Sequence, residues 1–288
     1  DIKSNIVNIM SQDQITIVIT AYRSENKIIS CLETINEYCR IIVIENSNNS
    51  SLKIKIENKF LNAQCILAGK NLGYAKGNNL GLSMVKTPYA LIINPDAILQ
   101  KDTIKNFLVT AGKIKNFAII GPAQQDEKNL VKNLNKLTEV DSVKGFAMFL
   151  KMDEFKEIGF FDENFFIYLE EIDLCKRIKK SNKKIYIDPS ILIDHQGGSS
   201  HEKEYNFEME LSRNWHWMWS TFYFNKKYNG YFFALRFALK KIISSILKYI
   251  FYFFIFNKRK KLIYKQRLSG LLNSILGKPS WYRPFSNN

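Results

Sequence analysis

The sequence predicts an α/β fold with a mostly parallel sheet that is covered by helices on both faces. Short β-branched runs alternate with helical stretches through the first two thirds of the chain. The first two runs, 15–20 and 41–44, each end in polar residues, and ligands bind at the carboxyl ends of strands in such sheets. The 288 residues, 46% of them hydrophobic, are enough for one sizeable core and a smaller appendage.

The first βαβ unit is the clearest part of this pattern. Residues 15–20 (ITIVIT) and 41–44 (IIVI) are β-branched runs, and residues 25–38 between them have helical spacing. Further strands are expected at 64–67, 89–93, 118–120, 185–187 and 191–193, and further helices at 74–85 and 103–114. This alternation favours parallel strands with helices on both faces of the sheet.

Polar residues follow the first four predicted strands, at the edge where open α/β sheets bind ligands. They suit the binding of a nucleotide, and they are Thr20, Ala21, Tyr22, Glu45, Asn71, Gly73, Asn78, Asn94 and Asp96. The Glu45 carboxylate is able to accept the N–H of a pyrimidine ring. In residues 71–81 (NLGYAKGNNLG) the glycines permit a close backbone approach and the amides can form hydrogen bonds.

The same glycine-containing segment has a plainer alternative. Its spacing is not that of the GxGxxG fingerprint, so the sequence does not predict a dinucleotide site. Taken alone, residues 71–81 are typical of a loop and helix that glycines interrupt.

Two strand-end residues have the chemistry of metal ligands. Asp96 follows the apolar run 90–93 behind a proline, where a hard oxygen ligand can hold Mg²⁺ or Mn²⁺ against a diphosphate. An Asx turn is the alternative for Asp96. His195 follows the run 191–193 and is one of three histidines, so a metal ligand, a phosphate contact and a structural histidine all remain open.

An acidic helix start follows an aromatic-rich loop at Glu170, Glu171 and Asp173. Glu171 falls on the predicted buried face of this helix, whereas Glu170 and Asp173 point elsewhere. A carboxylate on a buried face is costly unless it is paired or used, so we expect a functional role for Glu171. Capping and solvation of a first turn explain the other two acids. The apolar residues that mark the buried face are Leu169, Ile172, Leu174, Cys175 and Ile178.

Composition limits the partners and the compartment. Lys and Arg outnumber Asp and Glu by 42 to 27, and the net charge of +15 predicts a polyanionic partner or an anionic surface. Nucleic acid, a membrane and a nucleotide sugar all qualify on charge. The four cysteines form no CxxC pair and lie mostly in apolar segments, which favours reduced thiols in the cytosol and argues against zinc.

The last third of the chain has the pattern of an interfacial helix. Residues 231–256 are almost entirely apolar, but Arg236, Lys240, Ser244 and Lys248 recur every four residues and give one polar side. These cations leave an apolar stretch well short of the roughly 20 residues that a membrane span needs. The basic cluster that follows is attractive to anionic lipid headgroups. The alternative is a helix packed on the α/β domain with a solvated basic face.

Three tryptophans alternate just before this helix, at Trp215, Trp217 and Trp219. Such alternation suits a membrane belt or a surface that stacks on an acceptor, and packing in a core is equally open.

Seven segments in one order resemble family 2 glycosyltransferases, particularly the rhamnosyltransferase-like branch that acts on surface polysaccharides. They cover about residues 14–200 and read ITIVITAYRSE, IIVIENSNNS, NLGYAKGNNLG, LIINPDA, VKGFAMFL, GFFDENFFIYLEEIDLCKR and DHQGGSS. Each segment is weak alone, whereas their order and spacing together are specific. The resemblance implies a Rossmann-like GT-A fold, an inverting reaction, a nucleoside-diphosphate sugar donor and a divalent cation, Mn²⁺ or Mg²⁺.

The resemblance also assigns roles to residues. It places Glu171, with Glu170 beside it, in the position of the catalytic pair, which is usually Glu-Asp in the family. Asp96 and His195 are the expected metal ligands, and the strand-end residues named above are the expected donor contacts. Gly145, Asp173 and Trp215 are the expected acceptor-side residues.

We therefore expect a metal-dependent glycosyltransferase, peripheral on the cytoplasmic face of the cell membrane. It would extend a polyprenyl-linked saccharide in surface polysaccharide assembly, from a dTDP-rhamnose donor or, as the alternative, a UDP-hexose. The expected regions are an N-terminal extension at 1–13, a GT-A catalytic domain at 14–204 and an aromatic and basic helical region at 205–288.

Two other classes of protein remain open. One is a non-catalytic GT-A-like membrane scaffold. The other is a basic nucleic-acid-binding protein, although the chain has no RNP motif, zinc pattern or basic recognition helix, so nucleic acid is not an expected partner.

Overall fold

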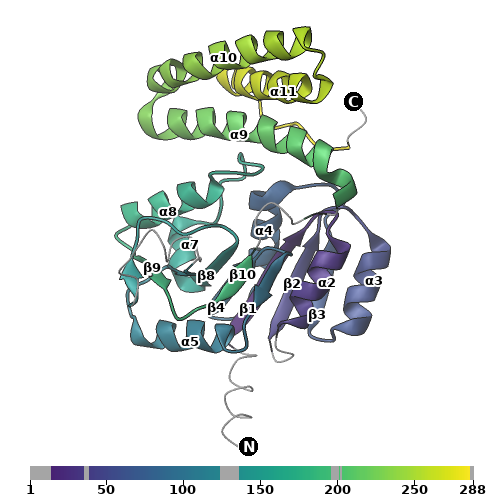
Figure 1. Cartoon of the computed structure of the whole chain (residues 1–288). Helices are drawn as coiled ribbons and strands as arrows, with labels where there is room; N and C mark the ends of the chain where they lie inside the picture. The colour runs from purple at the N-terminus through teal and green to yellow at the C-terminus, as the bar shows by residue number, and fades with distance from the viewer. Residues whose placement is uncertain (1–13, 36–38, 124–135, 196–200, 202, 286–288) are drawn as a thin grey trace, which may run out of the picture. The chain divides into compact units, whose positions relative to one another are not determined.

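A computed structural model of the chain describes residues 14–35, 39–123, 136–195, 201 and 203–285 (Figure 1). The predicted N-terminal extension at 1–13 and the last part of the DHQGGSS motif, 196–200, lie outside the described residues. The chain divides into two compact units. Unit 1 comprises residues 1–161 and 171–202, and unit 2 comprises 162–170 and 203–288. The short stretch 162–170, predicted to lie in the catalytic domain, thus belongs to unit 2.

Within the described residues, unit 1 is built around an eight-stranded sheet with the order β3-β2-β1-β4-β8-β6-β9-β7. Its strands are β1 (Ile15–Ala21), β2 (Arg40–Glu45), β3 (Ala63–Leu67), β4 (Tyr89–Ile93), β6 (Ile119–Pro122), β7 (Thr138–Glu139), β8 (Ala147–Lys151) and β9 (Ile185–Asp188). A separate antiparallel pair is formed by β5 (Ala97–Leu99) and β10 (Ile193–His195).

The sheet is mixed, and six of its eight described strands run in one direction, which agrees with the predicted mostly parallel sheet. Strands β1 to β4 pair in parallel, as do β6 and β9, but β8 runs antiparallel to both β4 and β6, and β7 antiparallel to β9. Strand β8 reads AMFLK and contains no β-branched residue, so the pattern of β-branched runs did not reveal it. Four of its five residues are buried, which is what a central strand covered on both faces requires.

Helices cover both faces of the sheet. On one face, Ile17 and Ile19 of β1 share a core with Ile28 and Leu32 of α2. On the other face, Val18 contacts α4. The helices of unit 1 are α2 (Glu25–Glu33), α3 (Ser50–Lys59), α4 (Gly73–Ser83), α5 (Thr103–Lys113), the 3₁₀ turn η1 (Met152–Glu154), α7 (Phe155–Ile158) and α8 (Glu170–Lys180), whose first residue is assigned to unit 2. Helices α2, α4 and α5 confirm the predicted ones, whereas α3 was not predicted.

Two glycines let α4 lie close against β1. A Cβ atom at Gly77 would be 2.6 Å from Thr20 Cγ2, and one at Gly81 would be 2.4 Å from Val18 Cγ1. Both distances are shorter than non-bonded carbon atoms tolerate. The sequence had connected these glycines with a ligand, and in the structure they serve the packing of a helix on the sheet.

Unit 2 is a group of three long helices, α9 (Asn206–Asn229), α10 (Tyr231–Phe254) and α11 (Lys258–Ile275), preceded by the 3₁₀ turn η2 (Lys203–Tyr205). Each packs on the other two (Figure 1). Gly230, with φ of +87°, separates α9 from α10, because a left-handed backbone suits glycine. None of the helices in the described part of the chain combines the length and the apolarity that crossing a bilayer requires.

The tryptophans of α9 belong mainly to the interior of unit 2. Trp215 has no exposed surface, and its Nε1 donates to Ser269 Oγ at 3.1 Å. Trp219 is also buried and donates to the Lys278 carbonyl at 2.9 Å. A ring without an exposed face cannot stack on a sugar, so the predicted acceptor-side role of Trp215 is corrected to core packing. Trp217 alone of the three is exposed.

A buried histidine completes this interior. Desolvation lowers the pKa of His216 to about 3, so its ring is neutral at neutral pH. The ring stacks on Phe166 at 4.4 Å, and its Nε2 lies 2.8 Å from the Tyr282 carbonyl. The residue thus ties the loop 162–170 and the C-terminal segment to α9.

Replacing Gly81 with alanine should destabilise the protein by about 1 to 3 kcal/mol, because the added methyl group would force Val18 and the helix apart. Gly112→Ala is the matched control, since Gly112 is also helical and no described atom lies within 4 Å of the position that its added methyl group would take. It should be neutral or stabilising by up to about 1 kcal/mol. Urea unfolding measures both variants, and equal stabilities would contradict the packing role.

Candidate active site

The carboxyl ends of four parallel strands meet at one edge of unit 1. Ala21 of β1 pairs with Glu45 of β2, which in turn pairs with Leu67 of β3. On the other side of β1, Ile19 pairs with Ile93 of β4. The residues that follow these strands therefore lie along one edge, as the sequence predicted.

Glu45 shapes the turn that follows β2. It is fully buried, and its two carboxylate oxygens accept the backbone N–H groups of Ser47 at 3.0 Å and Asn49 at 2.5 Å. Asn49 then caps α3 by accepting the N–H of Leu52 at 3.0 Å. A buried carboxylate is stabilised by such donors, so Glu45 has a structural role that the sequence did not reveal.

The predicted donor-binding amides form a network that fixes the start of α4. Asn78, fully buried, accepts the Thr20 hydroxyl at 3.1 Å and donates to the Tyr74 carbonyl at 2.9 Å. Asn71 Oδ1 accepts the N–H of Gly73 at 3.0 Å. Asn46, which the sequence did not single out, donates to the Gly73 carbonyl at 3.1 Å. The network holds the chain after β1, β2 and β3 in one rigid arrangement.

The remaining donor-side residues lie beside this network. Ala21 is buried at the end of β1, and Tyr22, the next residue, is half-buried. The guanidinium of Arg23 lies 5.8 Å from the centre of the Tyr22 ring. The backbone N–H of Arg23 donates to Ser47 Oγ at 2.6 Å, which joins the segment after β1 to the turn after β2.

Asp96 and His195, the two predicted metal ligands, lie together. His195 Nε2 is 3.4 Å from Asp96 Oδ1 and 3.3 Å from Asn94 Nδ2. Strand pairing creates this meeting, because β10 runs antiparallel to β5 and puts His195 opposite Ala97. Both side chains are nearly buried, at 10% and 2% exposure. Cys31 is a buried neighbour of Asp96. Burial, with the added effect of the Asp96 charge, raises the pKa of the Cys31 thiol far above its usual range.

This pair of side chains fits a divalent cation that binds a diphosphate. A carboxylate and an imidazole are suitable ligands for Mn²⁺, and Mg²⁺ often takes only one or two protein carboxylates beside phosphate oxygens. Among the described residues, no group of three or more His, Cys, Asp and Glu side chains is arranged to hold a metal by itself. The site therefore suits a cation that arrives with the phosphates of a ligand.

Gly145 connects Glu171 with the Asp96–His195 pair. A Cβ atom at Gly145 would be 3.6 Å from Glu171 Cβ and 3.3 Å from the Tyr74 hydroxyl, and that hydroxyl donates to the Gly145 carbonyl. The next residue, Phe146, stacks its ring on His195 at 4.5 Å. The N–H of Asn94 donates to the Phe146 carbonyl at 2.9 Å. Glu171 thus lies beside Gly145, and His195 lies beside the next residue, Phe146.

The burial of the acidic helix start is the reverse of the prediction. Glu171 is half-exposed, whereas Glu170 and Asp173 are buried, at 4% and 0% exposure. Glu171 shares a helical face with Leu174, Cys175 and Ile178, which are fully buried, but it is only the second residue of α8. Tyr168 and Leu169 are not helical, with φ of +75° and +69°, so the buried face does not extend back to a turn before Glu171.

Asp173 is a structural residue, which corrects its predicted acceptor-side role. Its Oδ2 accepts Arg177 Nε at 2.9 Å, one helical turn later. Arg177 also donates to the carbonyls of Ile158 at 2.7 Å, Gly159 at 3.2 Å and Phe160. The buried ion pair thus fixes the segment before the aromatic loop. The spacing of four residues between Asp173 and Arg177 could have predicted this ion pair from the sequence.

The loop before α8 is held by the helices of unit 2. Asp162 accepts hydrogen bonds from Lys227 Nζ at 2.7 Å and the Tyr223 hydroxyl at 3.0 Å. Burial raises the pKa of Asp162, but the Lys227 and Asn164 hydrogen bonds outweigh it and leave the pKa below its usual value. Ser220 Oγ donates to the Ile167 carbonyl at 2.9 Å. The two left-handed residues that follow cost on the order of 1 to 3 kcal/mol each, and such strain is frequent at functional sites.

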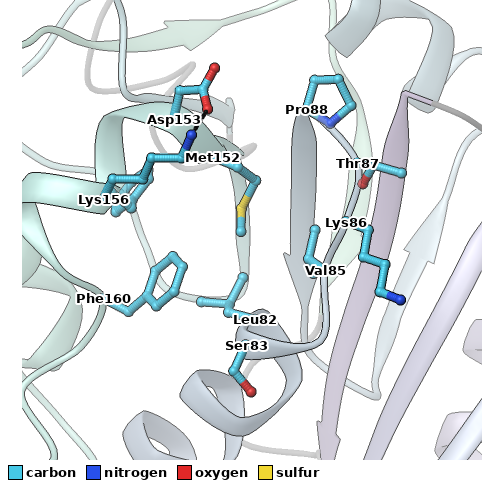
Figure 2. Close-up of a pocket in the computed structure, with 11 residues that line it drawn as sticks. Leu82, Ser83, Val85, Lys86, Thr87, Pro88, Met152, Asp153, Lys156 and Phe160 are labelled. Atoms are coloured by element: carbon cyan, nitrogen blue, oxygen red, sulfur yellow. Dashed lines mark ion pairs between the residues drawn. The ribbon is translucent and has the colours of Figure 1, made fainter.

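A hollow in unit 1 lies away from this site (Figure 2). It is formed between the segment that joins α4 to β4 and the segment of η1 and α7, where Asp153 and Lys156 form an ion pair at 2.9 Å. Thr87 and Pro88 at its rim precede β4, so it lies at the amino end of that strand. None of the predicted site residues lines this hollow, so it is not the candidate active site.

Comparison with known proteins agrees with this geometry. A mixed α/β sheet with polar groups at its carboxyl edge defines a ligand-binding α/β domain. The chain belongs to glycosyl transferase family 2, because the model of that family matches residues 16–175, more than half of the chain. The predicted family is thereby confirmed.

Two individual proteins of known activity are similar to the chain. It is 28% identical over 199 residues to the low-salt glycan biosynthesis hexosyltransferase Agl10 of Haloferax volcanii, covering 60% of this chain and 64% of that protein, less than two thirds of its length. It is 25% identical over 245 residues to rhamnosyltransferase WbbL of Escherichia coli, covering 72% of this chain and 90% of that protein.

A solved structure shows the fold. The mannosyltransferase PcManGT of Pyrobaculum calidifontis, in complex with GDP-Man and Mn²⁺, superposes with a TM-score of 0.60 at 12% identity. The match covers 94% of this chain and 89% of that one. The chain therefore has a mixed α/β, GT-A-like fold with an additional C-terminal helical region.

Replacing Arg177 with alanine should destabilise the protein by about 3 to 5 kcal/mol, because Asp173 would remain buried without its cation. Arg177→Lys should recover only part of this loss, since an ammonium cannot reproduce the contacts of a guanidinium with the Asp173 carboxylate and three carbonyls. Lys180→Ala, on the exposed side of the same helix, is the control and should stay near the wild type. Thermal unfolding that shows equal losses for Arg177→Ala and Lys180→Ala would contradict this role.

Proposed function

We propose that the protein is a glycosyltransferase that moves a sugar from a nucleoside diphosphate to a saccharide acceptor. The observation that carries this proposal is the arrangement of Glu171 and the Asp96–His195 pair around Gly145 and Phe146. Membership in family 2 supports it, as do a hexosyltransferase and a rhamnosyltransferase among the relatives.

Glu171 is the general base of the proposed reaction. Its half-exposed position lets an acceptor hydroxyl reach it, whereas the buried Glu170 and Asp173 are less accessible. Glu171 takes the proton of the acceptor hydroxyl while that oxygen attacks the anomeric carbon and the bond to the diphosphate breaks. Attack from the side opposite the diphosphate inverts the anomeric centre. Glu170 is the neighbouring carboxylate of the pair and lies at the rigid start of α8.

Asp96 and His195 would hold Mn²⁺ or Mg²⁺ against the diphosphate. The cation supplies positive charge that stabilises the departing diphosphate. Asn94 hydrogen-bonds near His195 and Phe146 stacks on its ring, so these two residues keep the imidazole in place. These contacts would thereby fix the orientation of His195 as a metal ligand, although His195 lies far from Asp96 in the sequence.

The donor would occupy the carboxyl edge of β1 to β4. Thr20 and Ala21 end β1 and Tyr22 follows it, and Glu45 ends β2; Asn71, Gly73, Asn78 and Asn94 complete the edge. We propose a dTDP-rhamnose donor, with a UDP-hexose as the alternative, because both bases offer the same ring N–H. The acceptor is a saccharide on a polyprenyl carrier, extended during the assembly of a surface polysaccharide.

Glu171→Gln should lower sugar transfer by roughly 10² to 10⁴-fold, because glutamine cannot accept the proton. Transfer is measured as release of nucleoside diphosphate from a panel of dTDP- and UDP-sugars, with a membrane lipid extract as the source of acceptor. Glu157→Gln, an exposed acid on α7, is the matched control and should keep wild-type activity. Transfer that survives in Glu171→Gln would reject the base assignment, and a wild type inactive with every donor would favour a non-catalytic scaffold.

Asp96→Asn and His195→Gln should weaken nucleotide binding only when a divalent cation is present. Isothermal titration of UDP and dTDP, each with MnCl₂ and then with EDTA, separates the two contributions. We expect at least tenfold weaker binding with Mn²⁺ and equal binding in EDTA for each variant, because the metal is held jointly by the side chains and the diphosphate. Equal losses in both conditions would instead assign Asp96 and His195 to the fold.

A further inference from the structure

The net positive charge of this chain comes from its C-terminal part. From Leu211 to Asn288 there are 15 Lys and Arg residues and no Asp or Glu. The whole chain has 42 basic and 27 acidic residues, so residues 1–210 contain 27 of each and carry no net charge. The net charge of +15 therefore lies entirely in the part that forms most of unit 2, which predicts an anionic partner for that unit.

Helix α10 packs within unit 2 through its small side chains. Ala234, Ala238 and Ser245 are buried and recur at helical spacing, and Ile242 between them is partly buried. Small residues on this stripe let α10 approach α9 and α11 closely. The large side chains of the helix are consequently left on its other faces.

The outer face of α10, opposite its buried stripe, exposes many large apolar side chains together with cations. Phe232 is 85% exposed, Leu247 62% and Phe254 70%, and Phe256 just after the helix is 88% exposed. Soluble monomers rarely expose apolar patches of this extent unless the patch binds something. The large apolar residues of this outer face are Phe232, Phe233, Phe237, Leu239, Ile243, Ile246, Leu247, Ile250, Phe251, Phe253, Phe254, Ile255 and Phe256.

Cations lie among and beyond the apolar residues of the outer face. Arg236, Lys240 and Lys248 are exposed on α10, on the side that the sequence predicted to be polar. Beyond its end, Lys260 Nζ lies 5.1 Å from the Tyr252 ring and Lys261 Nζ lies 5.3 Å from the Phe253 ring. Long cationic side chains can cover apolar surface with their stems while the charged end reaches a headgroup.

We infer that unit 2 docks on an anionic lipid bilayer through the outer face of α10, with this helix lying in the plane of the interface. Aromatic and aliphatic side chains would enter the boundary between headgroups and acyl chains, and these cations would contact lipid phosphates. The anionic leaflet in question is the cytoplasmic face of the cell membrane. Docking is independent of the catalytic roles proposed for unit 1.

Other occupants of this face fit the observations less well. A second copy of the chain would bring two strongly basic surfaces together, which like-charge repulsion opposes. A nucleic acid would satisfy the cations, but it offers no apolar environment for a row of phenylalanine and isoleucine side chains. An anionic bilayer satisfies both the charge and the apolar surface.

Co-sedimentation of the full chain with lipid vesicles tests the inference. The wild type should bind vesicles of phosphatidylcholine mixed with phosphatidylglycerol and bind pure phosphatidylcholine less, and salt should weaken the difference. Ile243→Glu with Leu247→Glu should lower the partition coefficient at least tenfold, because two apolar side chains leave the interface. Lys240→Glu with Lys248→Glu should lower it at least fivefold on anionic vesicles only.

Matched variants separate docking from other effects. Leu61→Glu changes a leucine that is 94% exposed in unit 1, and it should bind vesicles like the wild type. Circular dichroism and thermal unfolding check that the α10 variants fold. Glu171→Gln should also bind normally, so loss of transfer and loss of docking are distinguishable. Vesicle binding that is unchanged in the Ile243 and Leu247 double variant would overturn the inference, as would a dimer that those substitutions dissociate while lipid binding is absent.

Discussion

The parallel register of β1 with β2 and β4 is the constraint on which the rest of unit 1 depends. It brings the ends of these strands to one edge, where the chain after each strand contributes polar groups. A shift of one residue would exchange the two faces of β1, and Val18 would no longer meet the glycine face of α4. The amide network around Asn78 and the turn closed by Glu45 then fix the loops that leave the edge. The position of Asp96 follows from the same register, because Asp96 comes three residues after the end of β4.

Several carboxylates around the candidate site hold the structure, whereas Glu171 beside them is partly exposed. Glu45 accepts two backbone N–H groups, Asp173 accepts Arg177, and Asp162 accepts Lys227. Each compensates the burial of a charge with a specific donor. Glu171 is half-exposed and lies next to Gly145. Because Gly145 has no side chain, the space beside Glu171 and the Tyr74 hydroxyl is left open. Family resemblance thus favours Glu171, although its side chain is not buried as the helical period predicted.

Local patterns predicted most of the strands and the edge that carries the site, and they failed where long-range contacts decide. Strand β8 lacks β-branched residues, so only its pairing with β4 and β6 reveals it. The meeting of Asp96 with His195 requires the antiparallel pairing of β5 with β10, which no local pattern encodes. The left-handed Leu169 broke the helical period before α8. The sequence left open whether Trp215 lies on a surface or in a core. Its hydrogen bond to Ser269, which is 54 residues away, places it in the core.

The segment that leads into Glu171 belongs to the unit that we propose docks on the membrane. Residues 162–170 are assigned to unit 2, and Asp162 and the Ile167 carbonyl are held by side chains of α9. Glu170 is the last residue of this segment, and Glu171 follows it directly in α8. The chain itself therefore joins the start of α8 to the segment that α9 holds.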